Sequence, residues 1–175
     1  MKVKFTINEN NVLEKAELTD DKGAVITHGV RGYSDEDFDS SLLTDAVIPN
    51  GVTSIGDGAF SGCDWLSAVV IPDSVTSIGN RAFYDCYSLI KITIPESVTS
   101  IGDEAFTDCN QLESVSLPAR ITSIGVRAFA YCESLTDIII PDSVTSIGDM
   151  AFYGCSSLAA PFSGDTVGSI RDKGV

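Results

Sequence analysis

Residues 89–109 have the sequence LIKITIPESVTSIGDEAFTDC, and this stretch decides the fold. Ile92 and Ile94 alternate with polar residues, a pattern typical of a short strand with one buried face. Pro95 ends that strand, because proline has no N–H to donate to a strand ladder. The stretch therefore begins with a strand of a few residues that buries alternate side chains.

The second half of the stretch predicts a return path with a tight corner. Val98 and Ile101 lie three residues apart, so both side chains point inward from a second straight segment. Gly102 permits a sharp corner, since glycine adopts backbone conformations that other residues avoid. We expect Asp103 to cap one helical turn, which places Phe106 on the inner side.

The same stretch recurs along the chain at an interval of 23 residues. Segments related to IPESVTSIG begin at Ile48, Ile71, Ile94, Leu117 and Ile140. One coil cannot bury its apolar side chains alone, but stacked coils bury a continuous core, with strands about 4.8 Å apart. The repeat predicts a right-handed solenoid with one-turn helices near each Ala-Phe pair. Its parallel strands are expected near residues 45–48, 68–71, 91–94, 114–117 and 137–140.

The pattern LxxIxIPxSVTSIGxxAFxxC, which runs from Leu89 to Cys109, resembles the BspA-like branch of the leucine-rich-repeat family. The resemblance covers residues 43–158 closely and implies a leucine-rich-repeat solenoid. It also implies a surface, adhesion or interaction role with diverse partners, and a secreted or cell-surface location.

The spacing divides the chain into three regions. Residues 1–42 combine alternating apolar residues with turn-prone stretches, which predicts a β-hairpin or meander and a helical turn that cap the N-terminal end. Residues 43–158 hold five 23-residue repeats. Residues 159–175 keep Val167 and Ile170 in register but lose the strand pattern, so we interpret them as a degenerate last repeat or a truncated cap.

The chain carries 25 acidic and 11 basic residues, giving a formal net charge of -14. This charge argues against binding to nucleic acid or to an anionic membrane. No run approaches the ~20 apolar residues that a membrane span needs. The N-terminus lacks the apolar core of a signal peptide, so a cytoplasmic location stays open. The charge favours a monomer and opposes the weak end-to-end dimer that an incompletely capped last coil would form.

Five cysteines share the 23-residue spacing and are expected to form one inner column: Cys63, Cys86, Cys109, Cys132 and Cys155. Zinc sites need closer ligand spacings, and parallel side chains do not present disulfide geometry. We therefore expect buried free thiols and no metal or cofactor, with disulfides or redox chemistry as the alternatives.

Catalytic motifs are absent from the sequence. His28 is the only histidine, no serine lies in a GxSxG elbow, and no P-loop is present. Three aspartates resemble the start of a calcium loop: Asp35, Asp37 and Asp39. Ser40 and Ala46 stand where that loop needs glycine and glutamate, so we expect no calcium site. The sequence does not predict an enzyme.

Two surfaces are candidates for binding a partner. The strand side presents two outward columns, which contain Lys91, Thr93, Ser114, Ser116, Asp137 and Ile139. The opposite, helical side carries five aromatic residues: Trp65, Tyr84, Tyr87, Tyr131 and Tyr153. These aromatics either anchor a partner or pack over the joints between coils.

We therefore predict a non-enzymatic protein-binding module, with adhesion as one form of that role. Its partner is an unknown protein or glycan-bearing molecule. The alternative is a structural unit that assembles by stacking end to end.

Overall fold

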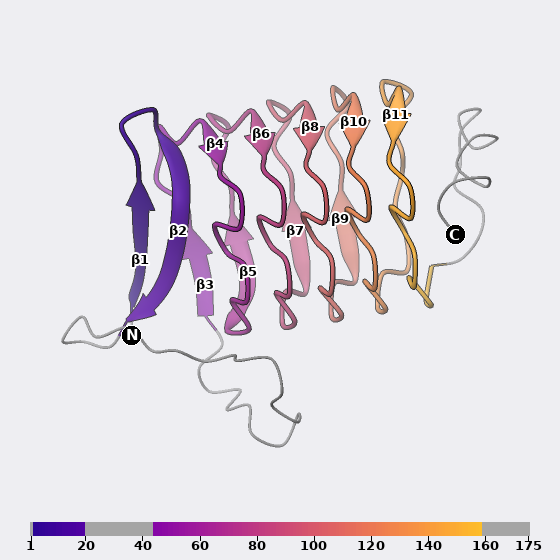
Figure 1. Ribbon diagram of the computed structural model, residues 1–175, viewed down its shortest axis with the longest axis horizontal. Helices are drawn as coiled ribbons and strands as arrows, with labels where there is room; N and C mark the ends of the chain where they lie inside the picture. Colours follow the sequence, from indigo (N-terminus) through magenta and orange to yellow (C-terminus); the bar gives the residue numbers. More distant parts are fainter. Residues whose placement is uncertain (1, 20–43, 159–175) are drawn as a thin grey trace, which may run out of the picture.

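The computed structural model describes residues 2–19 and 44–158, which form an elongated stack of similar coils (Figure 1). One side of the stack is a parallel sheet with the order β3-β5-β7-β9. Its strands are β3 (Thr44–Val47), β5 (Leu66–Val70), β7 (Lys91–Thr93) and β9 (Ser114–Ser116). These strands confirm four of the predicted ones, while the fifth is reduced to a single parallel bridge between Ser114 and Asp137.

A second sheet, which the sequence does not predict, joins the short straight segments of successive coils. Its order is β1-β2-β4-β6-β8-β10-β11. Its parallel strands are β4 (Ser54–Ile55), β6 (Ser77–Ile78), β8 (Ser100–Ile101), β10 (Ser123–Ile124) and β11 (Ser146–Ile147). Each of these strands has two residues, so no alternation of apolar and polar residues marks it in the sequence.

The N-terminal residues form an antiparallel hairpin of β1 (Lys2–Ile7) and β2 (Val12–Thr19). Strand β2 pairs in parallel with β4, and the Phe5 ring lies edge-on to the Phe60 ring with centroids 6.3 Å apart. The hairpin thus lies against the first coil, at the N-terminal end of the stack (Figure 1). The predicted helical turn before the first repeat, the aspartates at 35–39 and the last predicted region, 159–175, lie outside the described residues.

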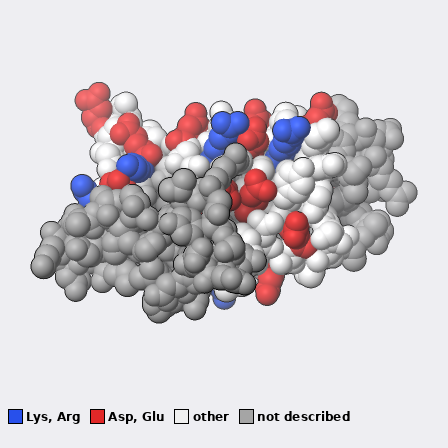
Figure 2. Space-filling view, turned by 60° about the horizontal axis from the view of Figure 1, so that its bottom comes forward, with Lys and Arg blue, Asp and Glu red and all other residues white. Residues whose placement is uncertain are grey.

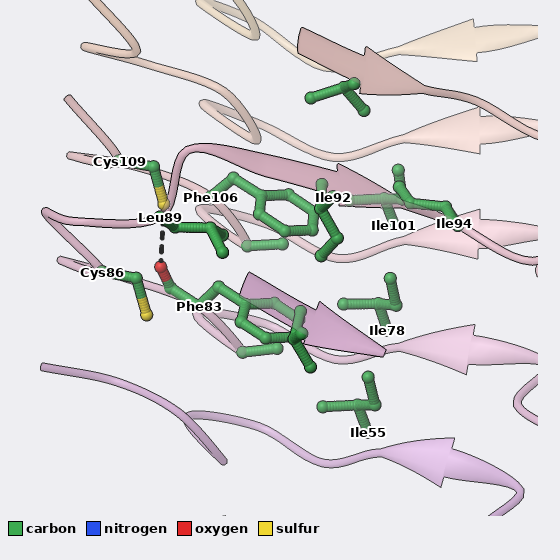
Figure 3. Close-up of a cluster of buried hydrophobic side chains, with 14 of the residues drawn as sticks. Ile55, Ile78, Phe83, Cys86, Leu89, Ile92, Ile94, Ile101, Phe106 and Cys109 are labelled. Carbon is green, nitrogen blue, oxygen red and sulfur yellow. Dashed lines mark hydrogen bonds between the residues drawn. The ribbon is translucent and has the colours of Figure 1, made fainter. Parts of the chain in front are cut away.

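The core consists of columns that contain one residue from each coil (Figure 3). The five phenylalanines stack nearly parallel: Phe60, Phe83, Phe106, Phe129 and Phe152. Their centroids are separated by 4.9, 5.1, 5.1 and 5.6 Å in that order, and none is more than 1% exposed. Because each ring packs on the rings before and after it, the column couples every coil to its neighbours.

The predicted one-turn helices do not form within the described residues, where tight turns replace them. We call the stretch from each corner glycine to the following cysteine, such as 79–86, a turn segment. Arg81 and Asp85 have positive φ angles of 55° and 59°, which interrupt a right-handed helix every four residues. The N–H of Phe83 consequently donates to the Ala105 carbonyl oxygen of the next coil, at an N···O distance of 2.7 Å. Within residues 2–19 and 44–158, no helix is long and apolar enough to span a bilayer.

Asp103 does not cap a helix in its own coil, contrary to the prediction. Its Oδ1 accepts a hydrogen bond from the N–H of Val126 in the next coil, at 2.8 Å. Asn80 accepts in the same way from the N–H of Asp103, and Asp57 accepts from the N–H of Asn80. These side chains therefore join successive coils at the corner, and this ladder ends at Val126, whose side chain has no acceptor.

Candidate binding surfaces

The outward face of β3, β5, β7 and β9, which we call the strand face, brings together residues separated by 23 positions. The first column pairs in register along the sheet and consists of Asp45, Ala68, Lys91, Ser114 and Asp137. All of these except the half-buried Ala68 are exposed. The side chains predicted to form this column therefore lie in one row on the surface.

The second column of the strand face is apolar at both ends and hydroxylated in the middle. It consists of Val47, Val70, Thr93, Ser116 and Ile139, all of them exposed. Val47 and Val70 are paired neighbours and are 64% and 58% exposed, while Ile139 is 65% exposed. Single exposed aliphatic residues are ordinary, but two adjacent valines on one sheet make a contiguous apolar area.

The charged side chains of the strand face lie in the first column and beside it. Asp45 accepts a hydrogen bond from the Ser67 hydroxyl at 3.0 Å, while Glu113 and Asp137 are exposed. Lys91 forms no ion pair with any residue in 2–19 or 44–158. The strand face therefore offers mostly acidic groups, and one lysine, around its aliphatic positions.

Trp65 is not a surface residue, contrary to the prediction for the helical side. Its side chain is 3% exposed and belongs to the main core cluster. It immediately precedes the buried Leu66 at the entrance to β5, and burial of a large indole gains hydrophobic free energy there. Trp65 cannot contact a partner without disrupting this core.

Of the four tyrosines predicted on this side, three lie in turn segments and Tyr87 directly follows one. Only two of them, Tyr131 and Tyr153, are in contact with each other. Tyr84 is half-buried, with the Arg81 guanidinium carbon 5.8 Å from its ring centroid. Tyr87 is 38% exposed. Tyr131 and Tyr153 are 42% and 45% exposed and meet edge to face, with centroids 5.4 Å apart.

The five cysteines are free thiols in one column, four of them buried and Cys155 half-buried. Four of the thiols donate to a phenylalanine carbonyl oxygen of the preceding coil, as Cys109 does to Phe83 at an S···O distance of 3.2 Å (Figure 3). Burial raises the pKa of the Cys63 thiol to about 12 and that of Cys155 to about 11. The prediction of full burial is therefore wrong at Cys155.

We expect a thiol reagent at pH 8 to modify Cys155 first and to leave Cys109 unmodified until the protein unfolds. Few thiols are ionised at that pH, and only Cys155 is partly accessible. Mass spectrometry of the labelled, digested protein measures each rate. All five cysteines should react in denaturant, and equal rates at Cys109 and Cys155 in the folded protein would contradict the column.

Asp64 is a half-buried carboxylate between two buried residues, Cys63 and Trp65. Its pKa is raised from its ordinary value of 3.8 to about 6, mainly by burial and secondly by the charge of Asp85. The protonated form is therefore favoured in the folded state. The resulting stability is fully present below pH 3.8 and is lost as pH rises to about 6.

Asp64→Asn should therefore stabilise the protein at pH 7 and much less at pH 4. We expect a gain of about 1 kcal/mol at pH 7, after allowing for solvent screening of a half-exposed carboxylate. Urea unfolding of both proteins at pH 4, 5, 6 and 7 measures this difference. A gain that does not grow with pH would show that the Asp64 carboxylate ionises freely in the folded protein.

A shallow groove of about 540 Å³ crosses the coils at the glycine corners. Small residues line much of it, including Gly102, Ser100 and Ser123. Its two carboxylates, Asp57 and Asp103, already accept backbone hydrogen bonds. Within the described ranges, no three His, Cys, Asp or Glu residues gather in a group that could hold a metal ion.

Comparisons with known proteins agree with this architecture. The profile of the BspA type leucine rich repeat region matches residues 33–159 with six copies. The chain is similar to the crystal structure of a leucine-rich repeat protein of T. pallidum, with a TM-score of 0.70 and 27% identity over 90% of this chain and 66% of that one. No functionally curated protein matches the chain.

Two further solved structures are similar. A leucine-rich repeat protein from Bacteroides ovatus has a TM-score of 0.72 and 31% identity over 95% of this chain and 41% of that one. One from Bacteroides capillosus has a TM-score of 0.52 and 27% identity over 93% and 94% of the two chains. The chain thus spans 66% and 41% of the T. pallidum and B. ovatus proteins. With its repeats matched over residues 33–159, the chain belongs to the BspA-type leucine-rich-repeat family.

Proposed function

We propose that the protein is a non-enzymatic binding module that contacts another protein through its strand face. The family consists generally of protein-interaction modules. The observation that carries the proposal is the pair Val47 and Val70, which are 64% and 58% exposed yet held in register on a hydrogen-bonded sheet. A partner that covers them gains apolar burial, and a preformed sheet loses little conformational entropy on binding.

The chemistry of the strand face defines the kind of partner that it fits. Its aliphatic positions need apolar side chains on the partner. The hydroxyls of Thr93 and Ser116, which lie between these aliphatic positions, can form hydrogen bonds with the partner. Asp45, Glu113 and Asp137 fit basic groups around those apolar side chains. The net charge of -14 would also accelerate the encounter with a basic partner. Adhesion to a protein or a glycan-bearing molecule is one form of this role.

The test compares proteins retained from an extract of the source organism by immobilised wild-type and variant chains. Val47→Glu combined with Val70→Glu places charges in the apolar area without touching the core. Gln111→Glu combined with Thr145→Glu adds the same charge at exposed positions away from the strand face. We expect the first variant to lose its partner by at least about tenfold and the control to retain it. Equal retention by both would refute the strand face as the binding surface.

End-to-end assembly is a second candidate, favoured by incomplete burial in the last described coil. Ile147, Cys155 and Leu158 are half-buried, whereas the equivalent Ile124 and Leu135 of the preceding coil are 1% and 0% exposed. Sedimentation at two ionic strengths tests it, because screening of the negative charge should promote such a dimer. A strict monomer at high salt that still retains a heterologous partner would favour the binding module.

A further inference from the structure

The repeat provides an internal reference for every position, and the turn segments of the last two coils depart from it. Val126 occupies the position of Asp57, Asn80, Asp103 and Asp149 in the other coils. Tyr131 occupies the position of Gly62, Asp85, Asp108 and Gly154, and Met150 that of Gly58, Arg81, Glu104 and Arg127. Three positions that are glycine, polar or charged in the other coils are therefore apolar or aromatic here, in a chain with a net charge of -14.

These residues lie with Arg127 and Tyr153 on the turn segments of two adjacent coils, as two contacting pairs and Val126, and we call the five the tyrosine–arginine patch. The rings of Tyr131 and Tyr153 meet edge to face at 87°. The Arg127 Nη2 lies 3.6 Å from the Met150 sulfur. All five residues are exposed, the four uncharged ones by 42–45%. The patch lies on the turn segments, which Figure 1 shows in front of the strand-face sheet.

Arg127 differs from its equivalent, Arg81, in the partner that its guanidinium finds. Arg81 forms a two-point ion pair with Glu104, with N···O distances of 3.0 and 3.2 Å. Methionine replaces that glutamate in the last coil, so Arg127 has no carboxylate partner within the described ranges. Its charge is therefore available to a carboxylate of another molecule.

The backbone holds two of the large side chains in an unfavourable conformation. Tyr131 and Met150 have φ angles of 58°, in the left-handed region that bulky residues avoid. Glycine occupies the equivalent positions at Gly58, Gly62 and Gly154, which shows that the coil needs no side chain there. The Tyr131 ring packs against Gly154, where a Cβ atom would lie 2.6 Å from the ring. The equivalent residues of the other coils have the same positive φ, so this conformation belongs to the coil itself. What is particular to the last two coils is that large, uncharged side chains occupy these positions.

We infer that the tyrosine–arginine patch binds a short acidic and apolar peptide segment of a partner protein. Tyrosine, arginine and methionine are enriched where proteins meet, and tyrosine and arginine dominate the binding energy there. A sugar would need several acceptors for its hydroxyl groups, and the patch offers only the hydroxyls of Tyr131 and Tyr153, since Val126 replaces the Asp or Asn of the other coils. Five residues cover less than a standard interface, so the occupant is a short segment. Figure 2 shows basic and acidic side chains side by side along the upper margin of the molecule, and uncharged surface with a few acidic side chains below them.

The test selects peptides from a random library displayed on phage, with the immobilised full chain as the target. We expect the selected peptides to combine Asp or Glu with aliphatic or aromatic residues. Met150→Glu gives Arg127 the carboxylate that Glu104 gives Arg81, and Tyr131→Asp restores the residue type of Asp85. Each variant should weaken peptide binding at least about tenfold. Each should also melt at the same or a higher temperature than the wild type, because it restores a residue type that the other coils already accommodate.

Controls separate this site from the strand face and from other ligands. Gln111→Glu and Tyr87→Ala alter exposed residues outside both surfaces and should leave peptide binding unchanged. A loss of peptide binding in Val70→Glu that Met150→Glu does not cause would place the peptide on the strand face and overturn the inference. Selection of peptides without acidic residues, or of none that depends on Tyr131 and Met150, would overturn the inference. The inference would also be overturned if the chain bound polygalacturonate, a uronic-acid polymer, and Met150→Glu abolished that binding while no selected peptide depended on Met150. A loss of binding accompanied by a lower melting temperature in both variants would show that the patch serves folding.

Discussion

Replacing Gly125 by alanine is expected to destabilise the protein by about 3 kcal/mol or more, the upper end of the cost of overpacking a core. A Cβ atom at this corner would lie 2.5 Å from the Gly102 carbonyl carbon and 2.6 Å from the Asp103 nitrogen. Both atoms are backbone of the preceding coil and cannot rotate away. Relief requires the two coils to separate, which stretches the 2.9 Å hydrogen bond from the Gly125 N–H to the Ile101 carbonyl oxygen.

Gly51→Ala is the matched control, because a Cβ atom there meets nothing within 4 Å. Gly51 has a φ of 93°, so alanine suffers only the conformational penalty of about 1 kcal/mol. Urea unfolding followed by circular dichroism gives the free energy of unfolding of both variants. If Gly125→Ala costs no more than Gly51→Ala, the close approach of coils at the corner does not hold the stack together.

The repeat makes the stacking and most of the strand-face sheet predictable from sequence. A spacing of 23 residues leaves one way to bury every Ile94-like and Phe106-like side chain, which is to place equivalent residues in columns. The outward columns follow from the same spacing, so the sequence alone places Lys91 and Thr93 on the surface. The repeat spacing does not indicate that Lys91 and Thr93 bind a partner, and that role is a proposal.

The predictions fail where backbone conformation, rather than side-chain pattern, decides the structure. The turn segments place Phe106 inward whether they are helical or not, so the pattern cannot distinguish one helical turn from two tight turns. Positive φ angles at Glu104 and Asp108 decide between them, and neither residue type indicates such a conformation strongly. The helix cap predicted at Asp103 is wrong for the same reason, because its hydrogen-bond partner belongs to the next coil.

The candidate binding surfaces are harder to predict than the fold, because the exposure of a side chain near a turn depends on the local backbone conformation. Trp65 lies next to an inward leucine, and its sequence position alone does not reveal that it turns into the core. The tyrosine–arginine patch, in contrast, leaves a signal in the sequence. Arg81, Glu104, Arg127 and Met150 occupy one repeat position in successive coils. Arg81 is followed there by its ion-pair partner Glu104 and Arg127 by Met150, so the loss of an acid in the coil after Arg127 is visible in the repeat itself.

Replacing Phe106 by alanine is the second substitution from which we expect a large loss, about 3–5 kcal/mol of unfolding free energy. Its ring is 0% exposed and stacks between Phe83 and Phe129, each with a centroid 5.1 Å away. Truncation removes both stacking contacts and leaves a cavity in the middle of the column. The cavity cannot collapse easily, because backbone hydrogen bonds such as that from the Phe106 N–H to Ala128 fix the distance between coils.

Phe106→Leu and Tyr87→Ala separate the two contributions to this loss. Leucine keeps most of the apolar volume but no ring, so we expect about half the loss, whereas the exposed Tyr87 should cost less than about 1 kcal/mol. Urea titration measures all three variants under one set of conditions. A loss for Phe106→Ala as small as that for Tyr87→Ala would mean that the column fills space without coupling the coils. In a stack where each coil contacts only its neighbours, loss of an interior ring weakens two interfaces at once, whereas loss of the last ring of the column weakens one.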